Sequence, residues 1–390
     1  MKRIGIIGTG FIATGLFNLL EKSKEYSVSK VLTRTKINLR TDFPNSHKLT
    51  NTLVDLITNS DLIVECSGDA IHATENIDKI LKASIPVVTM NSEFHITTGS
   101  YFIGKGLITE AEGDQPGSLA QLHEDVVAMG FKPLVYGNIK GFLNTNPSEE
   151  DMKFWSNKSG IAMDMTTSFT DGTKVQIEQV FVANGFNATI AKEGLIKLNN
   201  DDMKEGGSAL ALYAKELNQP ISDYLLSPKL PAGVFIVAEH DAIQADQLRY
   251  YKMGDGPYYV IERPFHLCHL EILKTISRVL RGDGVLLDNG NNPQLSVGTI
   301  AKKDLSKGTH IEKGIGSFEV RGEAIKIANH PNHLPIGLCA NVTLKRAIKA
   351  GEMLSFEDVV VPETLALEAW NSIIKTHNNQ TLLQKASTNE

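Results

Sequence analysis

Three polar clusters in the sequence combine residue types that can transfer a proton or hold an anionic ligand. The first is EGDQPG over residues 112–117, a glycine-rich loop ahead of a predicted helix. The second is TDGTK over residues 170–174, with Glu178 four residues after the lysine. The third is YYKMGDGPYY over residues 250–259, with Arg263 shortly after it. We expect the three clusters to line one shared cleft.

Lys174 is the first candidate for acid–base chemistry. When a carbonyl carbon gains or loses a hydride, its oxygen gains or loses a proton, and a lysine with a tuned pKa can serve this step. Asp171, a further candidate catalytic residue, and Glu178 lie near Lys174 in the sequence, and Lys140 and Lys252 are alternative candidates for the lysine. A second interpretation is that Lys174 and Glu178 form an ordinary pair, four residues apart, on a helix surface.

The same clusters contain residues that could bind a metal ion and a substrate. Asp171 and Glu178, or Asp114, could hold Mg²⁺ or Mn²⁺, since both ions favour carboxylate oxygens. A structural role for each of these carboxylates is equally open. Tyr251 and Arg263 lie in or beside the glycine-rich third cluster. We expect these two residues, together with Glu178, to bind the substrate, a small and anionic molecule.

A dinucleotide fingerprint lies near the start of the chain. Gly8, Gly10, Phe11, Ile12 and Ala13 belong to the pattern G-x-G-x-x-A, placed between a predicted strand and a predicted helix. The first glycine permits the turn, the second lets a pyrophosphate approach the backbone, and the small alanine allows close packing of helix on strand. A plain tight turn is the alternative. In this context the pattern predicts dinucleotide binding.

The end of the second predicted strand indicates which dinucleotide is bound. Enzymes that use NAD commonly place a carboxylate there, on the ribose 2′-hydroxyl. The sequence LTRT over residues 32–35 contains none. Arg34, helped by Thr35, Lys36 or Arg40, could pair with a 2′-phosphate instead. The alternative is a solvated surface arginine, and we favour NADPH.

Two later strand ends extend the predicted cofactor site. Ser67 and Gly68 follow one predicted strand, and Asn91 and Glu93 follow another. In open α/β sheets, ligands bind beyond the carboxyl ends of the strands. We therefore place these residues near the nicotinamide, although Glu93 could simply be a carboxylate at a helix N-terminus.

The positions of the predicted elements divide the chain into domains. Over residues 1–150, short apolar strands alternate with helices, which predicts a Rossmann domain, an α/β fold with a doubly wound parallel sheet. Residues 151–285 read as a central α+β catalytic and oligomerisation domain, whose last helix, 262–281, could return to the Rossmann domain. Short β runs fill 286–370, where 299–311 resembles 344–354, and 371–390 reads as a polar tail.

Composition excludes several classes of function. The net charge of −6 provides no basic stripe, so we expect no nucleic-acid partner. No apolar stretch reaches about 18 residues, so we expect no membrane span. The three cysteines lie far apart in the sequence, which indicates neither a zinc site nor a disulfide framework and fits the reducing cytoplasm.

Together, the fingerprint and the three polar clusters resemble one family over nearly the whole chain: homoserine-dehydrogenase-like NAD(P)-dependent oxidoreductases with a C-terminal SAF domain. The SAF module, a small β-clip, is matched by RAIKAGEML over residues 346–354 and by the related run 302–311. The chain departs from homoserine dehydrogenases proper at residues 90–92, where it reads Met-Asn-Ser and they usually have Ala-Asn-Lys.

The resemblance implies a reaction. The family includes enzymes similar to 1-deoxy-D-xylulose 5-phosphate reductoisomerase, which rearrange and reduce a keto-sugar phosphate with NADPH and a divalent cation. This is the first functional hypothesis, and analogy with such enzymes also implies a homo-oligomer. The alternatives are an NADP-dependent dehydrogenase of homoserine, another hydroxy acid or a polyol, and a regulatory protein that binds NADPH without turnover.

Overall fold

The computed structural model describes residues 1–387, with side chains through Asn379, and its chain forms two compact units. The first unit comprises residues 1–117, 267–291 and 364–390, and the second comprises 118–266 and 292–363. These limits differ from the expected boundaries at residues 150, 285 and 370. The first boundary differs because residues 118–150 belong to the second unit, and the later ones differ because residues 267–291 and 364–390 return to complete the first unit.

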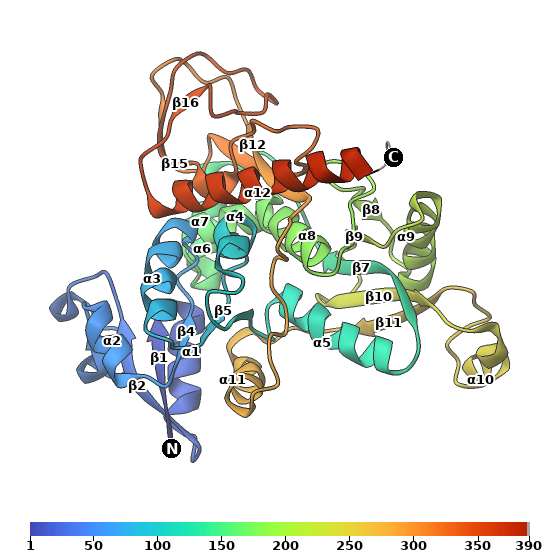
Figure 1. Ribbon diagram of the computed structural model, residues 1–390, viewed down its shortest axis with the longest axis horizontal. Helices are drawn as coiled ribbons and strands as arrows, with labels where there is room; N and C mark the ends of the chain where they lie inside the picture. Colours follow the sequence, from blue (N-terminus) through green and yellow to red (C-terminus); the bar gives the residue numbers. More distant parts are fainter. Residues whose placement is uncertain (388–390) are drawn as a thin grey trace. The chain divides into compact units, whose positions relative to one another are not determined.

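The first unit contains a six-stranded sheet in the order β3-β2-β1-β4-β5-β6 (Figure 1). All neighbouring strands are parallel. This is the strand order of a Rossmann fold, so that prediction is confirmed. The strands are β1 (Lys2–Ile7), β2 (Tyr26–Leu32), β3 (Leu49–Thr50), β4 (Leu62–Glu65), β5 (Val87–Thr89) and β6 (Ile108–Glu110). The connecting helices are α1 (Phe11–Leu20), α2 (Leu53–Asn59), α3 (Ala70–Lys82) and α4 (Ser92–Thr98).

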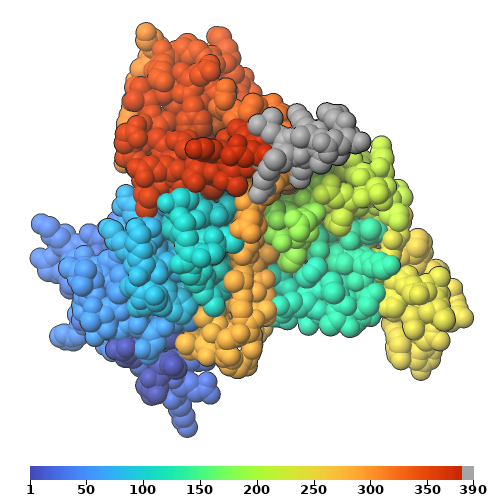
Figure 2. Space-filling view, viewed as in Figure 1, coloured from blue at the N-terminus to red at the C-terminus, as the bar shows by residue number. Residues whose placement is uncertain are grey.

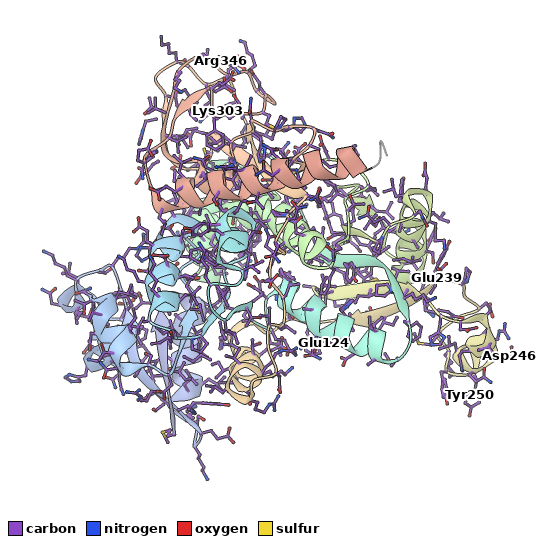
Figure 3. All side chains as sticks on the ribbon, viewed as in Figure 1. Glu124, Glu239, Asp246, Tyr250, Lys303 and Arg346 are labelled. Carbon is purple, nitrogen blue, oxygen red and sulfur yellow. The ribbon has the colours of Figure 1, made fainter. Side chains whose placement is uncertain are left out.

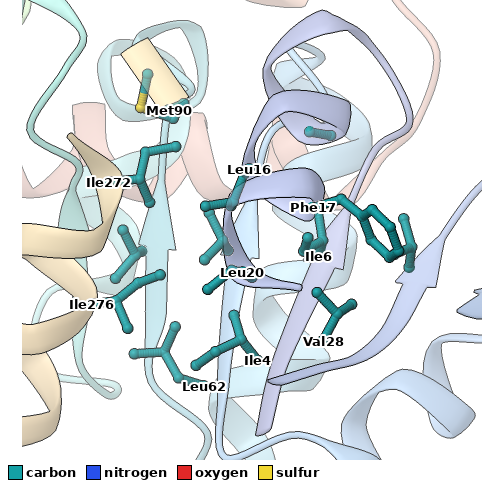
Figure 4. Close-up of a cluster of buried hydrophobic side chains, with 14 of the residues drawn as sticks. Ile4, Ile6, Leu16, Phe17, Leu20, Val28, Leu62, Met90, Ile272 and Ile276 are labelled. Carbon is teal, nitrogen blue, oxygen red and sulfur yellow. The ribbon is translucent and has the colours of Figure 1, made fainter. Parts of the chain in front are cut away.

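Helix α11 (Ile272–Arg281) is part of the core of this unit. Figure 4 shows Ile272 and Ile276 in one apolar cluster with Leu16 of α1 and Ile4 of β1, and all four are fully buried. The predicted return of this segment to the Rossmann domain is therefore observed. The helix predicted over 262–281 is wrong in its first half, because Pro264 disfavours helical geometry in the residue before it.

The C-terminal segment is helical rather than a frayed tail. Helix α12 (Leu365–Ser387) packs against α3 and α4. Ala366, Ala369, Trp370 and Ile373 are buried and recur at helical spacing, so one face of α12 belongs to the core. The expected tail over 371–390 is thus corrected as far as Ser387, and its last three residues lie outside the described part of the chain.

The second unit is built on a five-stranded mixed sheet in the order β11-β10-β7-β9-β8. The strands are β7 (Lys132–Lys140), β8 (Leu198–Asn199), β9 (Ile221–Leu226), β10 (Val234–Glu239) and β11 (Tyr259–Arg263). Its helices, with the one that leads into it, are α5 (Gln115–Ala128), α6 (Glu149–Ser159), α7 (Met163–Thr170), α8 (Thr173–Gly185), α9 (Met203–Leu217) and α10 (Ala245–Tyr250).

The two faces of strand β7 have different partners. Val135 and Ile139 belong to an apolar cluster with residues of α9. Asn138, which alternates with them, points to the opposite face and contacts α8. Helix α8 is buried from Thr173 through Asn184 even though many of its residues are polar. Such a helix must find its hydrogen-bond partners inside the protein.

The C-terminal part of the second unit is a β segment. It contains the pair β12 (Leu295–Ala301) with β14 (Val320–Lys326), and the three strands β13 (His310–Lys313), β15 (Ala340–Leu344) and β16 (Val359–Val360). The two similar runs seen in the sequence pair with each other, since Leu305 and Ile348 exchange two backbone hydrogen bonds. This pairing fits an internal duplication.

Candidate active site

The dinucleotide fingerprint adopts the conformation that its residues require. Gly8 has a φ of +110°, and a Cβ there would lie 2.9 Å from the carbonyl oxygen of Cys66. Gly10 is the N-cap of α1, and Ala13 is fully buried. Backbone N–H groups of the first turn of α1, around Ile12, are thus available to a pyrophosphate.

His269 lies against the fingerprint helix, a contact that the sequence analysis missed. A Cβ on Gly15 would lie 2.5 Å from the His269 ring, and the ring also meets the exposed Phe11 edge-on at 5.9 Å. His269 belongs to a short turn, η5 (Cys268–Leu270), which precedes α11. Burial lowers the pKa of His269. The contact joins residues far apart in the sequence, so no local pattern could have revealed it.

Two arginines lie near the adenosine end of the predicted cofactor site. Arg34 follows β2 and pairs with Asp69 at 3.1 Å, and its side chain is 66% exposed. Arg40 donates a hydrogen bond to the carbonyl oxygen of Thr9, inside the fingerprint turn. Arg34 thus lies just beyond the carboxyl end of β2, and Arg40 lies against the fingerprint turn.

A buried carboxylate was missed at the carboxyl edge of the parallel sheet. Glu65 is fully buried and is paired in register with Ile7 of β1 and Thr89 of β5. It accepts hydrogen bonds from the Ser67 N–H at 2.7 Å and from the Thr89 hydroxyl at 3.0 Å. Burial raises the pKa of Glu65. Its position at the end of a strand was the available signal.

The other residues predicted beside the nicotinamide lie at the same edge. Gly68 has a φ of +67°. The Asn91 side chain caps α4 by accepting the Phe94 N–H at 3.0 Å. Glu93 is 2% exposed and lies in the first turn of α4, so its interpretation as a carboxylate at a helix N-terminus stays open. Asp114, of the first polar cluster, accepts the Ser92 hydroxyl at 3.1 Å.

The second unit contains a buried charged cluster. The Glu178 carboxylate, 1% exposed, accepts hydrogen bonds from Asn138 Nδ2 at 2.9 Å and from Lys140 Nζ at 3.0 Å. Lys174 lies one turn earlier on α8 and is 6% exposed. The structure therefore brings Lys140 and Glu178 together with a third candidate one turn away. The interpretation of Lys174 and Glu178 as an exposed surface pair is wrong because both residues are buried.

Asp171 has a different partner from the one expected. Its carboxylate lies 2.7 Å from Lys302 Nζ and also accepts the Thr173 N–H at 2.8 Å. Glu178 is seven residues further along the chain, and seven residues of helix rise about 10 Å. Because each carboxylate is paired with a lysine and the two are far apart, they do not fit as ligands of one shared cation. No group of three metal-ligating side chains occurs among the described residues.

Arg263 lies on the same sheet face as the charged cluster. Residues paired directly across neighbouring antiparallel strands point to one face, and Arg263 pairs with Val234, which pairs with Asn138. Asn138 lies on the face of the sheet that α8 covers at β7, so Arg263 points to that same face. Two strand spacings separate Arg263 from Asn138, roughly 10 Å. The Arg263 guanidinium also packs over the ring of Phe265.

Tyr251 and Lys252 lie at the other end of the β10–β11 hairpin. Their loop joins β10 to β11 beyond the pair Ala238 and Tyr259, about 13 Å along the strand from Arg263. Both side chains are exposed, and their segment protrudes from the second unit in Figure 2. Figure 3 shows the neighbouring Tyr250 at its outer end. Within one chain, the structure therefore does not bring Tyr251 and Lys252 together with Lys140, Lys174 and Glu178.

Two family models match the sequence. Residues 8–99 match "Homoserine dehydrogenase, NAD binding domain", and residues 113–272 match "Oxidoreductase DRL, catalytic domain". No curated protein matches the chain. Together with the Rossmann sheet, the two matches identify the chain as an NAD(P)-dependent oxidoreductase.

Solved structures with a related fold include several dehydrogenases. A probable dehydrogenase from Thermotoga maritima is 13% identical, with a TM-score of 0.43, over 74% of this chain and 91% of that one. UDP-N-acetylglucosamine 3-dehydrogenase from Acidithiobacillus ferrooxidans is 10% identical, with a TM-score of 0.43, over 74% and 92%. Similarity at this level carries no information about the substrate. No described helix has both the length and the hydropathy of a membrane span.

Proposed function

We propose that the chain reduces the carbonyl group of a small anionic substrate with NADPH, and that a keto-sugar phosphate such as 1-deoxy-D-xylulose 5-phosphate is the leading candidate. The observation that carries this proposal is the ion pair between the buried Glu178 and the partly buried Lys140. Lys174 lies one turn away, and Arg263 lies on the same sheet face. Burying a carboxylate costs free energy unless it is paired, and a buried, lysine-paired carboxylate next to further cations is a candidate for a functional site.

The chemistry assigns a role to each group. Hydride transfer to a carbonyl carbon leaves negative charge on the oxygen, and a nearby ammonium group can stabilise that charge and donate a proton. Lys174 and Lys140 are the candidates for this donation. Glu178 orients Lys140 by its hydrogen bond of 3.0 Å. Arg263 is the candidate for the substrate's phosphate, since guanidinium groups bind phosphate in a bidentate manner.

The preference for NADPH over NADH rests on Arg34 and Arg40. Arg34 is largely exposed at the end of β2, and Arg40 is hydrogen-bonded to the fingerprint turn. Asp69 forms an ion pair with Arg34, and it also caps α3 by accepting the His72 N–H at 3.0 Å. This arrangement favours a 2′-phosphate over a 2′-hydroxyl.

The proposal also includes a C-terminal SAF-like module. The paired runs 299–311 and 344–354 support a SAF-like module, because they form one small β unit from two similar halves. The divalent cation of the reductoisomerase reaction has no supported ligand set at Asp171 and Glu178. The roles proposed above therefore involve only side chains of this chain, and the requirement for Mn²⁺ is measured directly.

The test is a substrate panel followed by NADPH absorbance, with and without Mn²⁺. It includes 1-deoxy-D-xylulose 5-phosphate, other keto-sugar phosphates, homoserine and simple hydroxy acids, the last two with NADP⁺. NADPH oxidation on a keto-sugar phosphate, lost in Lys140→Met, supports the proposal. Homoserine oxidation instead would assign the alternative dehydrogenase. Tight NADPH binding without turnover on any substrate would favour the regulatory hypothesis.

A further inference from the structure

The ion pair of Lys302 and Asp171 is almost completely shielded from water. The two side chains are 1% and 0% exposed, and Lys302 Nζ lies 2.7 Å from Asp171 Oδ2. Lys302 also donates a hydrogen bond of 2.6 Å to the carbonyl oxygen of Ser317. Asp171 lies between α7 and α8, whereas Lys302 follows β12 of the C-terminal β segment. The pair therefore joins the β segment to the start of α8.

Asp171 fixes the geometry with which α8 begins. Its Oδ1 accepts the Thr173 N–H at 2.8 Å, and between them Gly172 takes a φ of +87°. The Thr173 hydroxyl accepts in turn the Gly322 N–H of β14 at 2.9 Å. Lys174 is the next residue of the helix. Any movement of Asp171 is thus transmitted to the turn that carries Lys174.

Further contacts attach the same side of α8 to the β segment. The Gln176 side chain accepts the Ala324 N–H of β14 at 2.8 Å, and Asn184 Nδ2 donates to the Leu295 carbonyl oxygen of β12 at 3.0 Å. At about 100° per residue, Gln176 and Asn184 project to one side of the helix. Lys174 and Glu178 project on average about 140° around the axis from the mean direction of Gln176 and Asn184. One side of α8 is therefore held by the β segment while the other presents the charged cluster.

We propose that Lys302 is a positioning residue of the reaction: through Asp171 it holds the first turn of α8, so the C-terminal β segment forms part of the catalytic machinery. Replacing a buried ion pair by apolar side chains is often neutral for stability. Here the pair fixes the distance and the orientation between the end of β12 and the start of α8. The inference rests on the proposed function, because it assigns Lys174 and Glu178 to the reaction.

The first test compares Lys302→Met and Lys302→Arg with a matched control, Lys303→Met. Lys303 is the adjacent residue, also in an ion pair, but its side chain is 55% exposed (Figure 3). We expect Lys302→Met to lower kcat by about tenfold to hundredfold, the range for a displaced catalytic group. The Kd of NADPH should not change, Lys302→Arg should recover most of the loss, and Lys303→Met should match the unmodified enzyme.

A second variant separates positioning from folding. Lys302→Met leaves the Asp171 carboxylate buried without its counter-charge, and this variant could fail to fold. The double variant Asp171→Asn with Lys302→Met removes both charges and should fold. The positioning role predicts that its kcat stays low while its circular dichroism and NADPH binding are normal. A folded double variant with the kcat of the unmodified enzyme would overturn the proposal.

A readout without substrate distinguishes failure of this inference from failure of the proposed function. The rate at which acetic anhydride modifies Lys174 can be followed by mass spectrometry across a range of pH. We expect the double variant to change the rate for Lys174 at least severalfold and Lys303→Met to leave it unchanged. If no substrate is reduced, the proposed function fails, and this rate still decides the positioning. If the double variant shows an unchanged modification rate at Lys174, the positioning role of Lys302 is disproved.

Discussion

The ammonium group of Lys140 donates a hydrogen bond of 3.0 Å to the carboxylate of Glu178, and this joins the last residue of β7 to the middle of α8. Glu178 is 1% exposed and Lys140 is 17% exposed, so water screens their charges only weakly. Asn138 occupies the same carboxylate oxygen at 2.9 Å. The carboxylate therefore holds one amide and one ammonium group in a fixed relation.

Glu178→Gln should lower kcat by about a hundredfold, because a neutral amide no longer fixes the Lys140 ammonium group. The amide keeps one oxygen acceptor, so we expect the free energy of unfolding to fall by only about 1–3 kcal/mol. Steady-state kinetics and urea unfolding measure the two effects. Glu205→Gln, on the exposed side of α9, is the control. Equal kcat in both variants would remove Glu178 from the reaction.

Gly15→Ala should destabilise the first unit. Alanine in a helix is ordinarily favoured over glycine by about 0.5–1 kcal/mol. Here, however, the new Cβ would lie 2.5 Å from the His269 ring. Overpacking of this kind typically costs about 1–3 kcal/mol, so the net effect is a loss. Gly15→Ala combined with His269→Ala should recover the thermal unfolding temperature, and a double variant as unstable as Gly15→Ala alone would contradict the contact.

Arg34→Ala should raise the Kd of NADPH about tenfold and leave the Kd of NADH unchanged, since it removes a charged hydrogen bond to the 2′-phosphate. Its pair with Asp69 is exposed, so stability should change by at most about 1 kcal/mol. Arg3→Ala breaks a similar exposed pair, Arg3 with Asp61, and serves as the control. Fluorescence titration measures both constants. Equal weakening of NADH and NADPH would argue against recognition of the 2′-phosphate.

Asp223 should make stability depend on pH. Burial raises the pKa of Asp223 from 3.8 to about 6, although the backbone N–H groups of Ile196, Lys197 and Tyr224 act in the opposite direction. Between these values the native state holds a proton that the unfolded state releases. Its contribution to stability therefore falls as the pH rises from about 4 through about 6, by about 3 kcal/mol in total.

The measurement compares urea unfolding of the unmodified protein and of Asp223→Asn at several pH values. Groups common to both proteins cancel in the difference. We expect the unmodified protein to lose stability relative to Asp223→Asn as the pH rises from 4 to 7. A difference that stays constant over this interval would show that Asp223 keeps an ordinary pKa.

Much of the fold could be predicted because its signals are local. Gly8 through Ala13 sit between a strand and a helix, and their spacing alone identifies the turn. Alternating strands and helices predicted the parallel sheet that the structure shows. The helix over 262–281 was partly wrong because Pro264 outweighed the apolar periodicity around it. The C-terminal helix was missed because its polar side dominates the composition.

The sequence by itself determined the cofactor turn and the candidate residues, because backbone propensity and helical or strand spacing act over a few neighbouring positions. The tertiary structure decided how those candidates are paired. Lys140 is hydrogen-bonded to Glu178, and Asp171 forms an ion pair with Lys302 rather than sharing a metal site with Glu178. The tertiary structure also put Lys252 and Arg263 at opposite ends of one hairpin. Such relations depend on strand order and packing between distant segments, and no local pattern contains them.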